Sequence, residues 1–258
     1  MDYWTRQHTA GLVLTAFAVV AFVRLAMWMA RSPFPYRYQL LLFFVNQLLT
    51  RVLWRTTVEG HFQLARERGA VIIANHRSSV DPCFIQVVLP RIVHWFVAKE
   101  YFGLPLVGRF LEQLLTIPTN RGGNDTAATR KAIRYAQEGS LVGVLPEGRI
   151  NENDELLLPG RPGAALIALR ANVPIVPCYI EGAPYNGTFW GCLFMMARVR
   201  VVIGEPIDLS RYQGADFTPE LLKDVTISLL KSIATLAGHV EYQPVVAGRR
   251  WKPQKNNS

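Results

Sequence analysis

The sequence places a histidine and an aspartate five residues apart, directly after a short apolar run. The run, residues 71–74, is short and β-branched, which predicts a buried strand. Asp81 followed by Pro82 is typical of a helix N-terminus, with Asp at the N-cap and Pro in the first turn. His76 would then lie between a strand and a helix, where open α/β sheets bind ligands. A general base oriented by a carboxylate fits this spacing, and a loop histidine beside a purely capping aspartate is the alternative.

Two other predicted strands end in polar segments that contain arginine and glycine. Residues 114–118 precede Arg121, which is followed by two glycines, and residues 141–145 precede Pro-Glu-Gly-Arg at 146–149. We expect the ends of these strands to converge with His76 on one crevice. Guanidinium groups bind phosphate bidentately, and glycine lets backbone approach it, so Arg121 and Arg149 indicate a phosphate-bearing ligand.

These turns belong to a region in which short apolar runs alternate with helical patterns. The alternation predicts an α/β fold with a mixed, mainly parallel sheet flanked by helices. The expected strands are 71–74, 93–98, 114–118, 141–145, 173–180 and 198–203, and the expected helices begin at 81, 106, 124 or 125, 163 and 218.

The first 55 residues have a different character. Residues 11–30 are almost continuously apolar and would span about 30 Å as a helix, the thickness of a bilayer core. Two prolines within residues 32–35 break that helix, and residues 39–54 form a second, shorter apolar segment suited to an interface. We therefore predict an N-terminal two-helix membrane-associating segment; a signal peptide or a pair of buried core helices are the alternatives.

Charge supports this division into three parts. Residues 1–55 carry six Arg and one Asp, and the tail from Gly248 carries four basic residues and no acid, whereas residues 56–247 are neutral overall. We expect a membrane anchor (1–55), a catalytic α/β domain (56–238) and a basic tail (239–258). A neutral folded region argues against nucleic-acid binding, and basic charge beside apolar helices favours an anionic membrane surface.

The three cysteines, Cys83, Cys178 and Cys192, form no Cys-x-x-Cys pair. Their odd number and spacing argue against a disulfide framework or a zinc site and favour a reducing compartment. We expect no metal site.

At this point the motifs resemble a known family. Asn-His-x4-Asp at residues 75–81, Arg121, Pro-Glu-Gly-Arg at 146–149 and Val-Pro-Ile-Val-Pro at 173–177 follow, in order and spacing, the four motifs of the 1-acylglycerol-3-phosphate acyltransferase family. The resemblance covers about residues 56–205.

The chain departs from that family pattern at three places. Leu115 stands where the second motif usually opens with glycine, and Asn120 stands where aspartate is common. Arg149 follows Gly148 directly, without the usual intervening threonine. This shorter form resembles the one seen in some lysophospholipid acyltransferases and leaves the acyl acceptor open.

The resemblance implies a membrane-bound acyltransferase that moves a fatty acyl group from acyl-CoA or acyl carrier protein to a lysophospholipid hydroxyl. The expected acceptor is 1-acylglycerol-3-phosphate and the product phosphatidic acid, with no cofactor. His76 would be the general base and Asp81 its orienting carboxylate. The sequence has no Gly-x-Ser-x-Gly elbow, so direct transfer is favoured over a serine acyl-enzyme.

The other site residues have roles in binding. Arg121 would hold the acceptor phosphate, with help from Arg149 and more weakly from Lys99, whose alternative is a plain surface lysine. Glu147 and Gly148 would orient the acceptor, or Glu147 would brace its loop. Expected partners are membrane lipids, lysophospholipid and the acyl donor, with the catalytic domain on the cytoplasmic side of the membrane.

Two other hypotheses remain. The fold could act on another lysophospholipid or lipid acceptor, or it could be a non-catalytic lipid-binding membrane protein. The second would have no need of His76 and Asp81 together. A nucleic-acid-binding role is disfavoured by the neutral folded region.

Overall fold

The computed structural model describes residues 16, 19, 20, 23, 24, 27, 37–65, 67–89, 91–120, 125–188 and 190–248. The chain divides into two compact units, residues 1–42 and residues 43–258. In the first unit the described residues are helical, and helix α2 (Arg37–Leu48) begins there. All later elements belong to the second unit. The predicted three-part division of the chain stays a prediction.

Most of the apolar segment predicted over residues 11–30 lies outside the described residues. Within the part of the chain that is described, no helix combines the length and the apolar character needed to cross a bilayer. The second predicted segment is present as α2 followed by the π-helical turn η1 (Leu49–Leu53).

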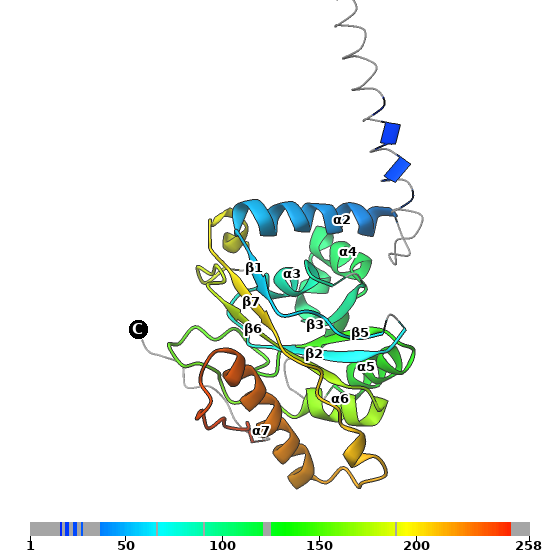
Figure 1. Ribbon diagram of the computed structural model, residues 1–258, viewed down its shortest axis with the longest axis vertical. Coiled ribbons are helices and arrows are strands. Elements are labelled where there is room, and N and C mark those ends of the chain that lie inside the picture. Colours follow the sequence, from blue (N-terminus) through cyan, green and yellow to red (C-terminus); the bar gives the residue numbers. More distant parts are fainter. Residues whose placement is uncertain are drawn as a thin grey trace, which may run out of the picture. The chain divides into compact units, whose positions relative to one another are not determined.

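Seven strands form one sheet in the order β1-β7-β6-β2-β5-β3-β4 (Figure 1). The pairs are parallel except for β6 and β7, which are antiparallel. The prediction of a mixed, mainly parallel sheet is therefore confirmed. The strands are β1 (Thr57–Glu59), β2 (Ala70–Ala74), β3 (Val93–Ala98), β4 (Ile117–Thr119), β5 (Leu141–Val144), β6 (Ile175–Glu181) and β7 (Arg200–Ile203).

Helices cover both faces of the sheet. Figure 1 shows α3 and α4 on one side, and α5, α6 and α7 on the other. The bounds of these helices are α3 (Asp81–Gln86), α4 (Pro105–Gln113), α5 (Thr126–Gln137), α6 (Gly163–Ala171) and α7 (Pro219–Leu236). Four short helical turns complete the fold: η1, η2 (Lys99–Gly103), η3 (Gly191–Phe194) and η4 (Ser210–Tyr212).

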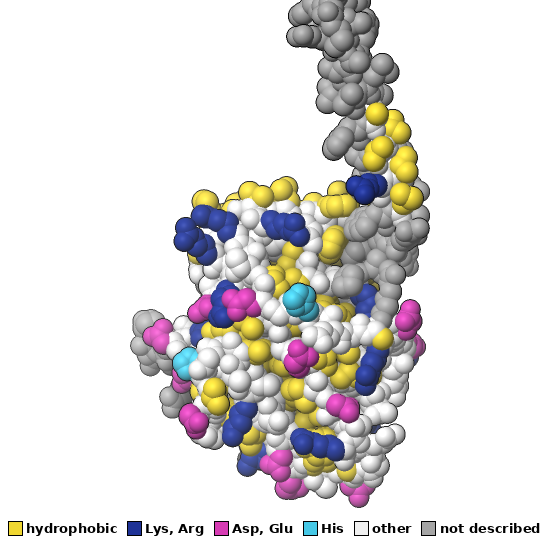
Figure 2. Space-filling model, viewed as in Figure 1, with side chains coloured by type: hydrophobic (Ala, Val, Ile, Leu, Met, Phe, Trp, Pro, Cys, Tyr) yellow, Lys and Arg dark blue, Asp and Glu magenta, His cyan; other side chains and the backbone are white. Residues whose placement is uncertain are grey.

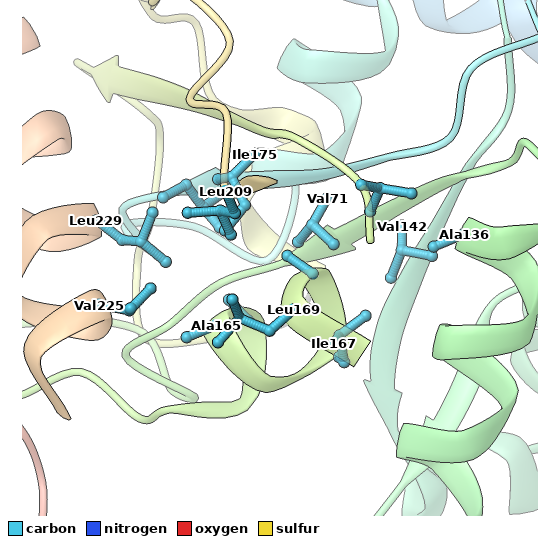
Figure 3. Close-up of a cluster of buried hydrophobic side chains, with 14 of the residues drawn as sticks. Val71, Ala136, Val142, Ala165, Ile167, Leu169, Ile175, Leu209, Val225 and Leu229 are labelled. Atoms are coloured by element: carbon cyan, nitrogen blue, oxygen red, sulfur yellow. The ribbon is translucent and has the colours of Figure 1, made fainter. Parts of the chain in front are cut away.

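Strand β2 lies at the centre and is buried along its whole length. Because side chains alternate along a strand, Val71 and Ile73 join the core beneath α5, α6 and α7, while Ile72 joins the core on the α3 side. Figure 3 shows the first of these cores, with Val71 facing helix α6. A strand covered on both faces explains why residues 70–74 are uniformly apolar.

On the α3 side, Trp54 anchors the end of η1 in the core. Its ring is fully buried and meets the Phe84 ring edge-to-face, with the ring centres 5.2 Å apart. Its indole N–H donates to the carbonyl of Cys192 over 3.3 Å. The segment that follows α2 is therefore fixed to the sheet domain at this point.

The structure corrects three details of the sequence prediction. The N-cap of α3 is Val80, which makes no side-chain cap bond, so Asp81 is the first helical residue and not the cap. Strand β4 begins at Ile117 instead of residue 114, because Leu115 ends the turn after α4 with a φ of 54°. Strand β1 was not predicted, since all three of its residues are exposed.

Candidate active site

His76 and Asp81 form a direct pair in the turn between β2 and α3. The Nδ1 atom of His76 lies 2.9 Å from Oδ2 of Asp81, whose side chain is fully buried, whereas 17% of the histidine side chain is exposed. Since a carboxylate only accepts, Nδ1 carries the proton and Nε2 is left as the basic nitrogen. Nε2 has no protein partner among the described residues. The pair can therefore accept a proton from a ligand.

The same carboxylate also orders the backbone of the turn. Oδ2 of Asp81 accepts the N–H of Arg77 at 2.7 Å and the N–H of Ser78 at 2.8 Å. Its other oxygen, Oδ1, is buried and has no partner among the described residues. Three donors on one oxygen fix the carboxylate against His76, so that the imidazole has a single orientation.

Glu147 and Asn151 hold the backbone of His76 from both sides. Oε1 of Glu147 accepts the N–H of His76 at 2.7 Å, and Oε2 accepts the N–H of Leu158 at 2.8 Å. The N–H of Asn151 donates to the carbonyl of His76 at 2.7 Å. Of the two roles expected for Glu147, these contacts fit a brace for the catalytic turn. The ends of β2 and β5 do converge here, as predicted.

Glu147 is almost fully buried. Burial raises the pKa of its carboxyl from 4.5 to about 7, and the hydrogen bonds from Leu158 and His76 oppose that rise. The brace therefore changes its protonation state near neutral pH.

Three more side chains tie the turn to β6 and to the segment that follows it. The amide of Asn75 donates to the carbonyl of Ile180 at 2.8 Å and accepts the Ile180 N–H at 2.7 Å. The hydroxyl of Ser78 donates to the carbonyl of Pro184 at 2.5 Å, and that of Ser79 lies 3.2 Å from the sulfur of Cys192. Neither hydroxyl makes a hydrogen bond to His76.

Arg77 is a site residue that sequence reasoning missed. Its guanidinium donates to the carbonyls of Asn151 at 3.2 Å, Asn153 at 2.6 Å and Glu155 at 2.5 Å. These bonds fasten the loop after β5 to the catalytic turn. The only local signal was its place next to His76, because carbonyl partners more than 70 residues away leave no pattern in the sequence.

Arg77 also borders a cleft of about 370 Å³ beside the turn. The other lining residues are Asn151, Glu152, Tyr179, Ile180, Glu181, Gly182, Ala183 and Tyr185. The cleft lies on the β6 side of the turn, and His76 itself is not among its lining residues.

The structure describes some of the residues predicted to bind the phosphate, but not all of them. Arg121 lies outside the described residues, in the gap at 121–124. Lys99, at the end of β3, extends its amine to within 3.1 Å of Oδ2 of Asp125, the N-cap of α5. The N–H of Asn120 donates to the same oxygen at 3.2 Å. Lys99 is therefore linked to both residues that flank the Arg121 segment.

Asp125 is strongly stabilised in its charged form. The backbone N–H of Ala128 and then the amine of Lys99 lower its pKa to about 2. The confirmed cap and this ion pair together fix the start of α5, which follows the Arg121 segment.

The loop after β5 contains Gly148 and Arg149. Gly148 has a φ of 69°, and a Cβ there would lie 3.1 Å from Nε of Arg161, so the loop conformation favours glycine. Arg149 is half-buried. It lies two residues after Glu147, on the loop whose carboxylate accepts the N–H of His76.

Leu115, which stands where the family pattern has glycine, has a φ of 54°. A left-handed backbone is easy for glycine and strained for leucine.

Among the described residues, no group of three or more His, Cys, Asp or Glu side chains is arranged to hold a metal ion. The three cysteines are free. Burial raises the pKa of Cys83 and of Cys178 to about 12, which keeps both thiols protonated.

Comparison with known proteins places this site in a family. A family model for acyltransferases matches residues 55–181. A 1-acyl-sn-glycerol-3-phosphate acyltransferase of Bacillus subtilis is 30% identical over 145 residues, which is 56% of this chain and 69% of that protein. The human 1-acyl-sn-glycerol-3-phosphate acyltransferase beta is 33% identical over 165 residues, 63% of this chain and 59% of that protein.

A crystal structure shows the same fold. The 1-acyl-sn-glycerophosphate (LPA) acyltransferase PlsC from Thermotoga maritima superposes with a TM-score of 0.57 at 21% identity, over 90% of this chain and 98% of that chain. The family model and the named relatives indicate the same family that the motifs around His76 and Glu147 resemble. The chain belongs to the 1-acyl-sn-glycerol-3-phosphate acyltransferase family and is an acyltransferase.

Proposed function

We propose that this acyltransferase moves a fatty acyl group from a thioester, acyl-CoA or acyl carrier protein, to the free hydroxyl of a lysophospholipid. The names of two relatives point to 1-acylglycerol-3-phosphate as acceptor and phosphatidic acid as product. The observation that carries the proposal is the 2.9 Å contact between Nδ1 of His76 and Oδ2 of Asp81.

In the proposed reaction, Nε2 of His76 takes the proton of the acceptor hydroxyl while the oxygen attacks the thioester carbonyl carbon. The C–O bond forms and the C–S bond breaks, and the leaving thiolate takes the proton from the imidazolium. Oδ2 of Asp81 stabilises the imidazolium in between, as the carboxylate does in a Ser-His-Asp triad. The buried brace of Glu147 holds the histidine backbone in place throughout.

The phosphate of the acceptor would bind Arg121, with Arg149 assisting from the loop after β5. Lys99 supports this role through Asp125, with which it frames the Arg121 segment. Bidentate guanidinium contacts suit a phosphate monoester, whose charge a single lysine would hold less specifically.

We also propose that the enzyme works at a membrane, with its catalytic domain on the cytoplasmic side. Figure 2 shows hydrophobic side chains gathered along one edge of the molecule. The second unit exposes several large apolar side chains, among them Leu48 (63%), Val52 (64%), Leu106 (83%), Phe194 (86%) and Met196 (68%). Such exposure is unusual for a protein surface in water and suits contact with lipid.

A second acceptor class has support from the sequence. Arg149 follows Gly148 directly, as in some lysophospholipid acyltransferases, and Asn120 replaces an aspartate near Arg121. An acceptor with a phosphodiester headgroup in place of a phosphate monoester is the alternative.

A lipid-product analysis tests the proposal. The full-length protein in detergent is incubated with acyl-CoA or acyl carrier protein and, separately, with lysophosphatidic acid, lysophosphatidylglycerol and lysophosphatidylethanolamine. We expect phosphatidic acid to form fastest. Faster acylation of a phosphodiester lysolipid would show that such a lipid, and not lysophosphatidic acid, is the acceptor. The absence of product with every donor and acceptor would refute the proposed reaction.

A further inference from the structure

A second cleft lies where η1 meets β1 and the end of α3. Its volume is about 300 Å³, and its lining consists of Arg51, Thr56, Val58, Val87 and Val88. The lining thus holds one cation, one hydroxyl, three valines and no acid. A single positive charge beside three valines is the composition expected of a site for a small anion with an apolar attachment.

The two polar side chains of this cleft have hydrogen-bonding capacity that no described residue uses. The side-chain oxygen of Thr56 is buried and has no hydrogen-bond partner in the described part of the chain. Buried hydroxyls almost always have partners, so this one is expected to bind a ligand or solvent. The guanidinium of Arg51 is exposed and makes no ion pair with any described residue.

The backbone between these residues is shaped to bring them together. Arg55 has a φ of 38°, which is uncommon for a residue other than glycine, and the N–H of Thr56 donates to the carbonyl of Thr50 at 2.8 Å. This tight reversal returns the chain from η1 to β1. Arg51 and Thr56 therefore line one cleft although they lie in different elements.

The surroundings of the cleft suit a lipid better than a free ion. Leu48 and Val52, on either side of Arg51 in the chain, are 63% and 64% exposed. Figure 2 shows Lys and Arg side chains directly beneath the hydrophobic edge that follows α2. Guanidinium and hydroxyl groups just beneath an apolar edge lie at the depth of phospholipid phosphates when that edge enters a membrane.

We propose that this cleft binds the phosphate of an anionic phospholipid with a phosphodiester headgroup, such as phosphatidylglycerol, at a site separate from the acyl-transfer centre. Arg51 donates to the phosphate oxygens, and the hydroxyl of Thr56 donates to one of them. The single cation matches the single charge of a phosphodiester, and the three valines contact the glycerol and the first acyl carbons. The site rests on the proposed membrane association, but its test is independent of acyl transfer.

The test measures lipid retention by the full-length protein in a mild detergent, using native mass spectrometry with added phosphatidylglycerol or phosphatidylcholine. We expect one retained phosphatidylglycerol and little phosphatidylcholine. Arg51→Gln and Thr56→Val should each lower retention at least about tenfold, the loss of one hydrogen bond to a charged group. Thr56→Ser keeps the hydroxyl and should retain the lipid as the wild type does.

Arg211→Gln serves as the matched control, because Arg211 is an exposed arginine in η4. Equal losses in the Arg51 and Arg211 variants would indicate general charge attraction and overturn the site. Unchanged retention in Thr56→Val, or equal retention of both lipids, would overturn it as well. Displacement of the lipid by millimolar inorganic phosphate would show an anion site without lipid preference and would also contradict the proposal.

Acyl transfer in detergent micelles separates this proposal from the proposed function. We expect the Arg51 and Thr56 variants to keep wild-type rates there. If wild type transferred no acyl group but retained phosphatidylglycerol through Arg51 and Thr56, the lipid site would stand and the proposed reaction would not.

Discussion

The turn after β2 and the cleft beside η1 differ in whether their polar groups have hydrogen-bond partners. In the turn, the polar groups of Asn75, His76 and Glu147 bind protein partners in the interior, with Oδ1 of Asp81 as an exception. In the cleft, the hydroxyl of Thr56 is buried without a partner among the described residues. The turn therefore holds the His76 side chain in a fixed geometry, whereas the cleft keeps hydrogen-bonding capacity for a ligand.

The largest expected effect comes from removing the charge that orients His76. In Asp81→Asn the amide oxygen would keep the three N–H donors that Oδ2 holds, but the negative charge that stabilises the imidazolium would be lost, so the histidine would be a much weaker base. We expect kcat to fall about 10³- to 10⁴-fold with a much smaller change in KM, measured by steady-state acyl transfer. Ser79→Ala, in the same turn, is the matched control and should stay within about threefold of wild type. A kcat above one tenth of wild type in Asp81→Asn would show that the carboxylate is not needed.

The next largest expected effect is the pH dependence of stability that the buried carboxyl of Glu147 produces. The folded-state pKa of Glu147 is raised from 4.5 to about 7 by burial, so its protonated form favours the folded state. That contribution is complete below pH 4.5 and is lost as pH rises through 7. Relative to Glu147→Gln, the wild type should therefore lose roughly 3 kcal/mol of unfolding free energy between pH 4.5 and pH 7. Chemical denaturation of both proteins across this range measures the difference, and parallel curves would mean that the carboxyl does not titrate there.

A smaller effect is expected where the turn is tied to β6. Asn75→Ala leaves both the N–H and the carbonyl of Ile180 without their side-chain partner in the core. We expect the free energy of unfolding to fall by about 2 kcal/mol. Thr188→Ala, which removes an exposed hydroxyl that donates to Asn186 and accepts the N–H of Gly191, is the control and should change stability by less than about 1 kcal/mol, because water can replace both bonds. Equal losses of unfolding free energy in both variants would show that the bonds of Asn75 to Ile180 do not stabilise the fold.

The smallest effect concerns the strained position before Arg121. Leu115→Gly relieves a left-handed backbone, whereas Leu114→Gly at a φ of −77° relieves nothing. Both leucines are half-buried, so their loss of apolar contact is similar. Thermal unfolding should show Leu114→Gly to be the less stable variant by about 1 kcal/mol. The reverse order would mean that Leu115 is not strained.

Much of the fold followed from the sequence, because its elements are local patterns. The predicted strand at 93–98 coincides with β3, and Asp125 and Thr218 cap α5 and α7 as their positions before a helix indicate. The pairing of His76 with Asp81 was also predictable, since both residues lie in one short turn.

What the sequence did not reveal depends on partners distant in the chain. The bonds of Arg77 to the loop after β5 and of Asn75 to Ile180 link residues more than 70 positions apart. Strand β1 has no buried face to produce alternation, and the cap expected at Asp81 moved to Val80 because the carboxylate binds the preceding turn. Such contacts arise from the folded arrangement and have no local signature.

The most direct test of the proposed catalysis is the acyl-transfer rate of His76→Gln, measured with purified full-length protein, acyl-CoA and lysophosphatidic acid in detergent. Glutamine keeps the backbone bonds to Glu147 and Asn151 but has no basic nitrogen. We expect kcat to fall at least about thousandfold while the thermal unfolding midpoint stays near that of wild type. A rate within tenfold of wild type would contradict the role of His76 as the general base.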